Sequence, residues 1–287
     1  MEKLAIVTDS SADIPDELIK KYDIRIAPLY IHTRGKEFRD KIDITNNEIY
    51  ELLYQDVEVK TSSPSPRDFL DIYKDLLENQ GVNTIYSIHL SSKLSNTIDS
   101  ARIAKSNLPN AEIEVFDSRT VTISMGLIVL EAAKLLARGE EKQKIKDALN
   151  ILTGRSSFYA TVGNFEYLLR GGRVGGLKRL LNMALKVKPV LIIEDGKVKL
   201  IKITRTRKGS IESMIQEFKK IYSNKGKVRA AIFYGNDLEA AQFMNQQLKS
   251  DKSLDIEEII FTEITPVIGT HSGPTVIGLS AVPSLFS

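Results

Sequence analysis

The fold is decided around residues 89–101, which read HLSSKLSNTIDSA. The preceding residues 85–88, IYSI, form an apolar run that predicts a buried strand. Leu94, Ile98 and Ala101 then recur with spacings of four and three, which predicts an amphipathic helix. The stretch is therefore a strand-to-helix turn. It carries three hydroxyls close together, those of Ser91, Ser92 and Ser95.

Two interpretations of these serines remain open. Serine is a preferred residue for capping the first turn of a helix, so the hydroxyls could serve the helix alone. The carboxyl ends of strands in open α/β sheets are also where ligands usually bind, and a helix N-terminus there favours an anion. The rest of the chain has to decide between the two.

The N-terminal half repeats this strand-to-helix pattern. Short apolar runs predict strands at Leu4–Val7, Ile24–Tyr30, Thr84–His89 and Glu112–Phe116. Helix-start signals lie between the strands: Asp13 and Pro15, a capping box at Thr45–Glu48, and an N-cap at Ser65 followed by Pro66. Residues 32–41 and 61–66 are expected to be loops, and a long helix is expected at about Val121–Ala137. The alternation predicts a parallel sheet with helices on both faces.

The pattern changes near residues 153–154. We therefore predict an N-terminal α/β domain over residues 1–153 and a C-terminal α+β domain with a mixed sheet over residues 154–287. Asp195-Gly196 between two apolar runs is a hairpin signal. Residues 177–185 are expected to be helical, and strands are expected at 158–162, 228–234, 256–261 and 275–282.

Composition excludes several classes of protein. The chain has 287 residues, a net charge of +3 and no cysteine, so disulfides, cysteine-based zinc sites and a thiol nucleophile are ruled out. The small net charge argues against a nucleic-acid partner. The N-terminal apolar run is too short for a signal peptide, and no apolar run reaches the length of a membrane span. We expect a cytoplasmic protein.

The three histidines differ in context. His32 lies in a polar segment and is expected to be structural or exposed, and His89 ends a buried strand, where a satisfied core histidine is expected. His271 lies within residues 270–274, THSGP, a predicted turn that presents side chains. No residue spacing predicts a metal site, and the Gly-x-Ser-x-Gly motif of many hydrolases is missing from the sequence. Ser95 with His271 and either Asp9 or Asp117 remains an alternative catalytic arrangement.

Basic residues cluster in the second half. A solvated surface and a docking face for a partner or a phosphate-bearing ligand both fit this pattern. The cluster comprises Arg170, Arg173, Lys178, Arg179, Lys186, Lys188, Arg205, Arg207 and Lys208.

Six motifs, in order along nearly the whole chain, resemble those of the DegV family of bacterial fatty-acid-binding proteins. They are Thr8–Asp13 (TDSSAD), Thr61–Pro64 (TSSP), Ser91–Thr97 (SSKLSNT), Val115–Ser118 (VFDS), Arg170–Arg173 (RGGR) and His271–Pro274 (HSGP). The resemblance implies two α/β domains that hold a long-chain fatty acid in a tunnel, with its carboxylate near their interface. No further cofactor is implied.

By motif, the resemblance places the carboxylate-binding residues at Thr61 and Ser95, with His271 beside the head group. Ser62, Ser92 and Asn96 are expected to complete the head-group loop. Close relatives in the family serve as the non-catalytic binding subunit of a fatty acid kinase, whose separate ATP-binding subunit resembles dihydroxyacetone kinases and phosphorylates the carboxylate. The acyl-phosphate would feed phospholipid synthesis. Arg173 and Arg205 are the implied docking positions, and lipid exchange implies a transient membrane contact.

Three positions depart from the family pattern. Ser63 stands in place of glutamine, Asn96 in place of glycine, and Thr275 in place of the glycine that follows Gly-Pro. A serine-dependent esterase or acyl-transfer enzyme that uses Ser95 and His271 remains the alternative function.

Overall fold

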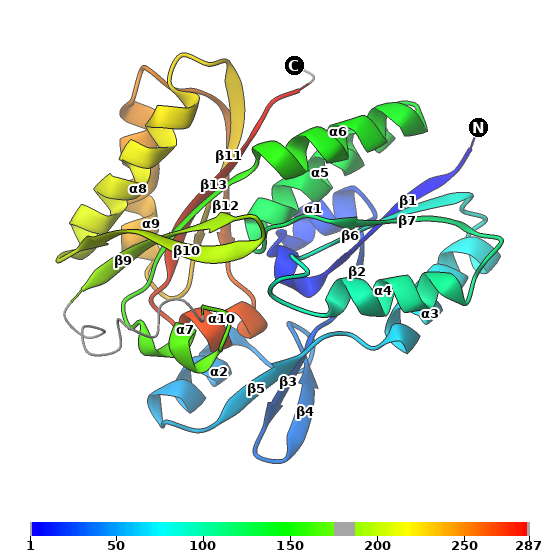
Figure 1. Cartoon of the computed structure of the whole chain (residues 1–287), viewed down its shortest axis with the longest axis horizontal. Helices are drawn as coiled ribbons and strands as arrows, with labels where there is room; N and C mark the ends of the chain where they lie inside the picture. The colour runs from blue at the N-terminus through cyan, green and yellow to red at the C-terminus, as the bar shows by residue number, and fades with distance from the viewer. Residues whose placement is uncertain (1, 175–186, 286–287) are drawn as a thin grey trace.

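The computed structural model describes residues 2–174 and 187–285 (Figure 1). Its N-terminal half is built on a four-stranded parallel sheet with the order β2-β1-β6-β7. The strands are β1 (Leu4–Asp9), β2 (Arg25–Ala27), β6 (Thr84–His89) and β7 (Glu112–Asp117). The carboxyl ends of these strands therefore meet at one edge, as the alternating pattern predicts.

Helices cover both faces of this sheet. They are α1 (Asp16–Lys21), α3 (Pro66–Lys74, continued by a π-helical turn, Asp75–Asn79), α4 (Thr97–Ser106), α5 (Ile123–Ala137) and α6 (Lys142–Arg155). Helix α2 (Asn46–Tyr54) packs elsewhere, in a cluster with Ile31 and Val267. The capping box at Thr45 and the N-cap at Ser65 before Pro66 are confirmed, because each hydroxyl accepts the backbone N–H three residues ahead. Phe69 and Tyr73 of α3 are fully buried against the sheet.

A second, three-stranded antiparallel sheet was not predicted. Its order is β4-β3-β5, from β3 (Tyr30–Thr33), β4 (Lys36–Arg39) and β5 (Val59–Ser62). The expected loop at 32–41 is thus a hairpin, and the expected strand at 24–30 is divided between two sheets. The expected loop at 61–66 begins as strand. These strands are short and largely polar on their outer face, so they lack the apolar runs that identified the others.

The C-terminal half contains a mixed six-stranded sheet, as expected, with the order β10-β9-β8-β13-β11-β12. The strands are β8 (Ser157–Thr161), β9 (Lys188–Glu194), β10 (Lys197–Thr204), β11 (Lys227–Tyr234), β12 (Asp255–Glu263) and β13 (Ile277–Pro283). The hairpin at Asp195-Gly196 is confirmed, with positive φ at both residues. The helices are α7 (Glu166–Arg170), α8 (Arg207–Tyr222), α9 (Leu238–Ser250) and α10 (Pro266–Ser272). The helix predicted at 177–185 lies outside the described residues.

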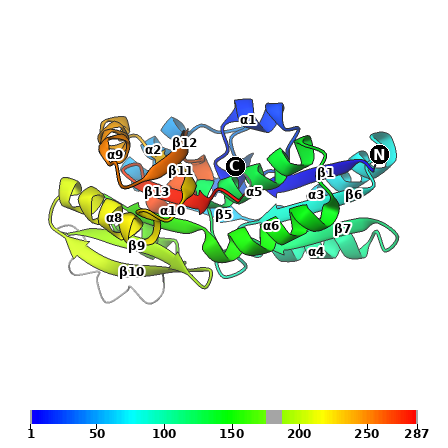
Figure 2. The same cartoon turned by 90° about the horizontal axis from the view of Figure 1, so that it is seen from above.

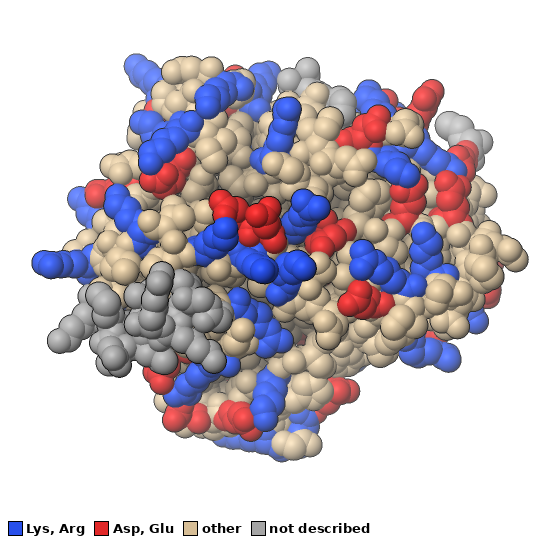
Figure 3. Space-filling model, viewed as in Figure 1, with Lys and Arg blue, Asp and Glu red and all other residues tan. Residues whose placement is uncertain are grey.

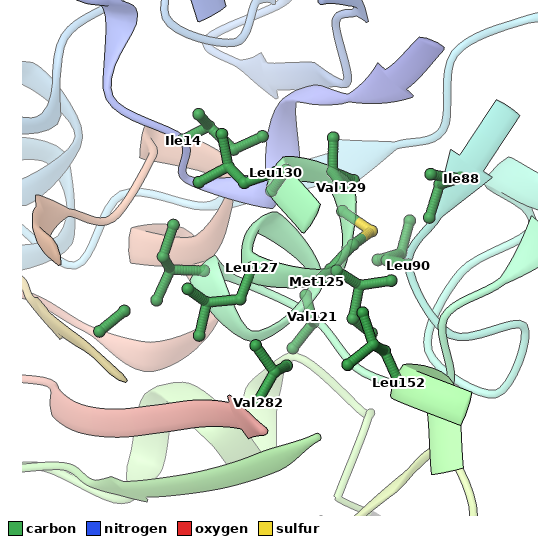
Figure 4. Packing of buried hydrophobic residues seen from close by; sticks show 14 of the residues in the cluster. Ile14, Ile88, Leu90, Val121, Met125, Leu127, Val129, Leu130, Leu152 and Val282 are labelled. Carbon is green, nitrogen blue, oxygen red and sulfur yellow. The ribbon is translucent and has the colours of Figure 1, made fainter. Parts of the chain in front are cut away.

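Helix α5 lies between the two large sheets and joins their cores. It contacts β1 on one side and both β11 and β13 on the other. Figure 4 shows Met125, in the first turn of this helix, beside Leu90, with Val121 just before the helix, while Leu127 faces the side of Val282. The largest hydrophobic cluster therefore includes residues from both halves. The division at residue 153 stays a prediction.

The two halves lie side by side, with the elements of the C-terminal sheet on the left and those of the N-terminal parallel sheet on the right in Figure 2. Both α5 and α10 lie near the junction in that view. Within the described part of the chain, no helix is long and apolar enough to cross a bilayer.

Candidate functional site

A cavity of about 500 Å³ lies between the two halves. Most of its wall is apolar, and the C-terminal half contributes residues that lie on or next to the strands of its sheet. These residues are Phe158, Ala160, Val162, Leu191, Val198, Phe233 and Val276. The N-terminal half contributes Leu29, Leu90, Leu94 and Val121. A cavity of this size and lining suits a ligand with a long apolar part.

Hydroxyl groups and one imidazole form a polar part of the same cavity wall. It includes every predicted head-group residue: Thr61, Ser62, Ser92, Ser95, Asn96 and His271. Ser63, which was noted only as a departure from the family pattern, lines the cavity too. The structure thus brings together segments that lie more than 200 residues apart in the sequence.

Thr61 and His271 are hydrogen-bonded to each other in this polar wall, with 2.8 Å between Thr61 Oγ1 and His271 Nε2. Thr61 lies on β5 and His271 lies in the last turn of α10. The other ring nitrogen, Nδ1, is buried and has no protein partner among the described residues. A side chain at Gly171 would place its Cβ only 2.5 Å from Nδ1, so the Arg-Gly-Gly-Arg motif requires glycine there for close approach.

Helix α10 holds His271, and two buried aspartates from the N-terminal half hold the start of that helix. Asp40 Oδ1 accepts the N–H of Val267 at 2.9 Å, and Asp13 Oδ1 accepts the N–H of Thr265 at 2.9 Å. The side chain of Thr265 forms no cap bond of its own. The expectation of a turn at residues 270–274 is therefore wrong for Thr270–Ser272, because caps from distant residues stabilise a short helix there.

Burial shifts the pKa of His271, at the end of α10, and the pKa values of the two aspartates that cap the start of this helix. Desolvation, helped by the nearby Arg173 charge, lowers the pKa of His271 to about 4, so its imidazole is neutral at neutral pH. Desolvation also raises the pKa of Asp40 to about 6 and that of Asp13 well above its usual value. His271 therefore contributes a neutral hydrogen-bonding group to the cavity wall.

Ser95 forms the second part of the polar wall. Its Oγ lies 2.8 Å from Ser63 Oγ and 2.9 Å from Thr97 Oγ1, and it accepts the Thr97 N–H at 3.3 Å. Ser95 thus lies at the start of α4 and lines the cavity. Asn96 is exposed, and its side chain makes no cap bond. The serine found in place of glutamine at position 63 is therefore a direct partner of Ser95.

The loop that carries Ser95 is tied to both halves. Ser91 Oγ donates to the Gly196 carbonyl of the β9–β10 turn at 2.8 Å, and the Ser91 N–H donates to Thr120. Ser92 N–H points to the Asp117 carboxylate at 3.4 Å. The serines of residues 89–101 thus divide their roles: Ser91 fixes the loop, and Ser95 faces the cavity.

The alternative catalytic arrangement is not assembled. Ser95 Oγ bonds Ser63 and Thr97, whereas the imidazole of His271 bonds Thr61. Asp9 is instead bonded to His89, as the prediction of a satisfied core histidine requires. His32 does not lie in a loop as expected: it is on β3 and lies 2.8 Å from Ser62 Oγ.

The predicted docking arginines lie at different places. Arg173 lines the cavity, and its guanidinium donates to the carbonyl of Gly171 at 2.6 Å and points to that of Leu94 at 3.4 Å. Arg205 is exposed beyond the end of β10 and does not line the cavity. Figure 3 shows Lys and Arg gathered across the middle of one face, with acidic side chains among them. Gly175, Gly176, Lys178, Arg179 and Lys186 lie outside the described residues.

Among residues 2–174 and 187–285, no group of three or more His, Asp or Glu side chains could hold a metal ion. Thr275, another departure from the family pattern, lies away from the cavity lining and accepts the Gly163 N–H at 3.0 Å. The polar wall is thus built from hydroxyls, an imidazole, the amide of Asn96, and the basic side chains of Lys93 and Arg173.

The fold and cavity define an α/β protein with a largely apolar site between its two halves, and comparison with known sequences identifies the family. The model of a family described as "Uncharacterised protein, DegV family" matches residues 3–284. The chain belongs to the DegV family. It is 34% identical to a DegV domain-containing protein of Caldanaerobacter subterraneus, over 97% of this chain and 98% of that one. It is 32% identical to one of Clostridium acetobutylicum over the same shares.

Solved structures agree with this assignment. A DegV family protein from Thermus thermophilus, described by its fatty acid binding, superposes with a TM-score of 0.93 at 30% identity, covering 98% of this chain and 100% of that one. A stearic-acid-binding protein from Eubacterium ventriosum gives a TM-score of 0.89 at 29% identity, covering 99% and 98%. DegV of Bacillus subtilis, a fatty acid binding protein, gives 0.87 at 27% identity, covering 99% and 100%.

Proposed function

We propose that this protein binds a long-chain fatty acid in the cavity between its two halves and presents the carboxylate to a separate kinase subunit. The observation that carries the proposal is the asymmetry of the cavity, which combines an apolar wall from the C-terminal sheet with a cluster of neutral hydrogen-bonding groups around Thr61, Ser95 and His271. Fatty-acid-binding relatives with the same fold support it.

The apolar wall supplies the affinity. Burial of about 15 methylene groups contributes roughly 12 kcal/mol at about 0.8 kcal/mol each. Association costs of several kcal/mol are subtracted from this value. The remainder is enough for tight binding, so the head-group residues are needed for orientation more than for strength.

The head group is bound without a tight ion pair. Hydroxyl donors and a neutral imidazole hold a carboxylate by hydrogen bonds, while the N-terminus of α4, Lys93 and Arg173 add positive charge at the cavity wall. Such a carboxylate keeps more electron density for attack on a phosphoryl group than one clamped between two arginines. This arrangement suits a site that presents its ligand for chemistry performed elsewhere.

A second hollow gives access to that head group. An outer groove of about 660 Å³ is lined by Thr61, Arg173 and His271, which also line the lipid cavity, together with Lys60 and Arg170. The proposed carboxylate site thus lies at a wall shared by an apolar cavity and a polar groove. We infer that the kinase subunit approaches from this groove, that Arg173 and Arg205 contribute to its docking, and that the acyl-phosphate product serves phospholipid synthesis. Lipid exchange then needs a transient contact with a membrane.

Mass spectrometry of the purified protein under native conditions tests the binding step. We expect an acyl chain to copurify, and palmitic acid to reload the protein after delipidation. A protein that neither retains nor accepts an acyl chain would overturn the proposal.

In the presence of the kinase subunit, Arg205→Ala should slow phosphorylation and leave lipid loading unchanged. Loss of loading in Arg205→Ala would show that this arginine is misplaced.

A further inference from the structure

Strand β8 runs along the lipid cavity and presents every second side chain to it. Phe158 and Ala160 of this strand, and Val162 just after its end, line the cavity. Tyr159 and Thr161 lie between them on the other face of the sheet, are buried and do not line the cavity. Four residues of extended chain separate Phe158 from Val162, a distance of about 13 Å. The row of three side chains therefore follows the cavity along its length.

The Val162 end of this row is the end near the proposed head group. The chain continues from Val162 into α7, which contacts α10, and Gly171 after α7 lies directly against His271. Phe158 is at the opposite end, and it is the first residue of this fully described strand to line the cavity. An acyl chain whose carboxylate lies beside His271 therefore extends toward Phe158.

The ring of Phe158 is held in place at that end. It stacks on the ring of Phe233, with 5.3 Å between centroids and 28° between planes. Phe233 is only 1% exposed and lies over the backbone of Gly278, where a Cβ would clash with its ring. On the side of α5, Ser124 Oγ donates to the Ser157 carbonyl at 3.2 Å, which fixes the backbone next to Phe158. Phe158 itself is partly exposed, so part of its ring is open to a ligand in the cavity.

We propose that Phe158 is the floor of the acyl cavity and sets the longest acyl chain that this protein accepts. A ring stacked on a second, immobile ring does not move aside for further methylene groups without loss of packing. A chain that is too long must therefore either lift its carboxylate away from Thr61 and Ser95 or remain partly outside the cavity. The floor thus couples the length of the chain to the position of the head group. This inference rests on the proposed fatty acid binding.

Competition among saturated fatty acids tests the floor. The delipidated full-length protein is incubated with an equimolar mixture of myristic, palmitic, stearic, arachidic and behenic acids, and the bound acids are quantified by mass spectrometry. The wild type should show a sharp upper limit of chain length. Phe158→Ala makes room for about two further methylene groups, and burial of each is worth about fourfold in affinity. The bound fraction of the first acid beyond the wild-type limit should therefore rise about tenfold. Phe158→Trp should lower the limit.

Phe116→Ala is the matched control, because Phe116 is also a partly buried member of an aromatic pair, with Tyr86, but does not line the cavity. It should keep the wild-type limit. Phe158→Trp keeps an aromatic ring at the site, so it remains informative if the alanine variant does not fold. The same limit in wild type and in folded Phe158→Ala would overturn the floor alone, as would a limit that Phe158→Trp leaves unchanged. Failure of the wild type to bind any acyl chain would overturn the proposed function itself.

Discussion

Two histidines of this protein each form a hydrogen bond to a hydroxyl group, one in the closed interior and the other at the wall of the cavity. His89 ends β6 in full burial, with Asp9 Oδ2 at 3.0 Å from Nδ1 and Ser87 Oγ at 2.6 Å from Nε2. The ring of Phe69 packs edge-on against it, with 4.8 Å between centroids. His271 shares one nitrogen with Thr61 at the cavity wall, and its other nitrogen has no protein partner.

The difference separates architecture from a site for a ligand. The His89 network is closed: Asp9 also accepts from Ser11 and from the Leu90 N–H, and Ser87 continues to the Tyr73 hydroxyl at 2.7 Å. None of these hydrogen-bonding groups is free to bind a ligand. The polar groups around His271 line a cavity and still have free hydrogen-bond donors and acceptors. Only this cluster can therefore form new hydrogen bonds to the proposed carboxylate.

The largest expected effect is on the closed network. Asp9→Ala should lower the free energy of unfolding by about 3–5 kcal/mol, because it leaves His89 Nδ1, the Ser11 hydroxyl and the Leu90 N–H without their carboxylate partner in the interior. Urea unfolding followed by circular dichroism measures the loss. Asp9→Asn, which keeps one acceptor, should lose less. A loss below about 1 kcal/mol in Asp9→Ala would show that this network is not structural.

Asp40 sharpens the comparison, because it is buried like Asp9 but supports the helix that carries His271. Burial raises its pKa to about 6, so the fold favours its protonated form. The stability from this group is therefore fully present below about pH 4 and is lost as the pH rises through about 6, by up to about 3 kcal/mol. Ser10, Thr265, the Val267 N–H, Lys41 and Asp13 surround this carboxyl.

Asp40→Asn should remove this contribution to the pH dependence while retaining an acceptor for the Val267 N–H. Urea unfolding at intervals between pH 4 and pH 7 checks the effect, with the wild type as reference. We expect the stability of the variant to fall less over this range. Identical pH profiles for the two proteins would contradict the account of Asp40.

The smallest effects on the fold are expected at the open cluster. Ser95→Ala and Thr61→Val should each weaken palmitic acid binding by about 1–3 kcal/mol through loss of a buried hydrogen bond. Their unfolding free energies should change by less than about 1 kcal/mol, since both side chains are only partly buried. Calorimetric titration and urea unfolding separate the two quantities. Unchanged affinity in both variants would rule out the head-group assignment.

Local signals in the sequence predicted much of the fold. Apolar runs identified the parallel sheet, the capping box at Thr45 and the N-cap at Ser65 marked two helices, and Asp195-Gly196 marked the hairpin. The three-stranded sheet and α10 escaped prediction. The strands of that sheet are short and polar, and the start of α10 is held by Asp13 and Asp40, whose positions give no local sign of this role.

The site shows the same limit. The family motifs identified Thr61, Ser95 and His271, which the structure places on one cavity. The bonds from Ser63 to Ser95 and from Thr61 to His271 depend on contacts between distant segments. No spacing along the chain records such contacts, so only the folded arrangement reveals them.

The position of the bound carboxylate tests the central claim most directly. Nuclear magnetic resonance of palmitic acid labelled with ¹³C at its carboxyl carbon, bound to the delipidated protein, reports on the surroundings of that group. We predict one bound carboxyl signal, distinct from that of free palmitate, which moves in Ser95→Ala and stays in place in Thr161→Val. A bound signal that is the same in wild type and Ser95→Ala would contradict the account, because the carboxylate would then lie away from Ser95.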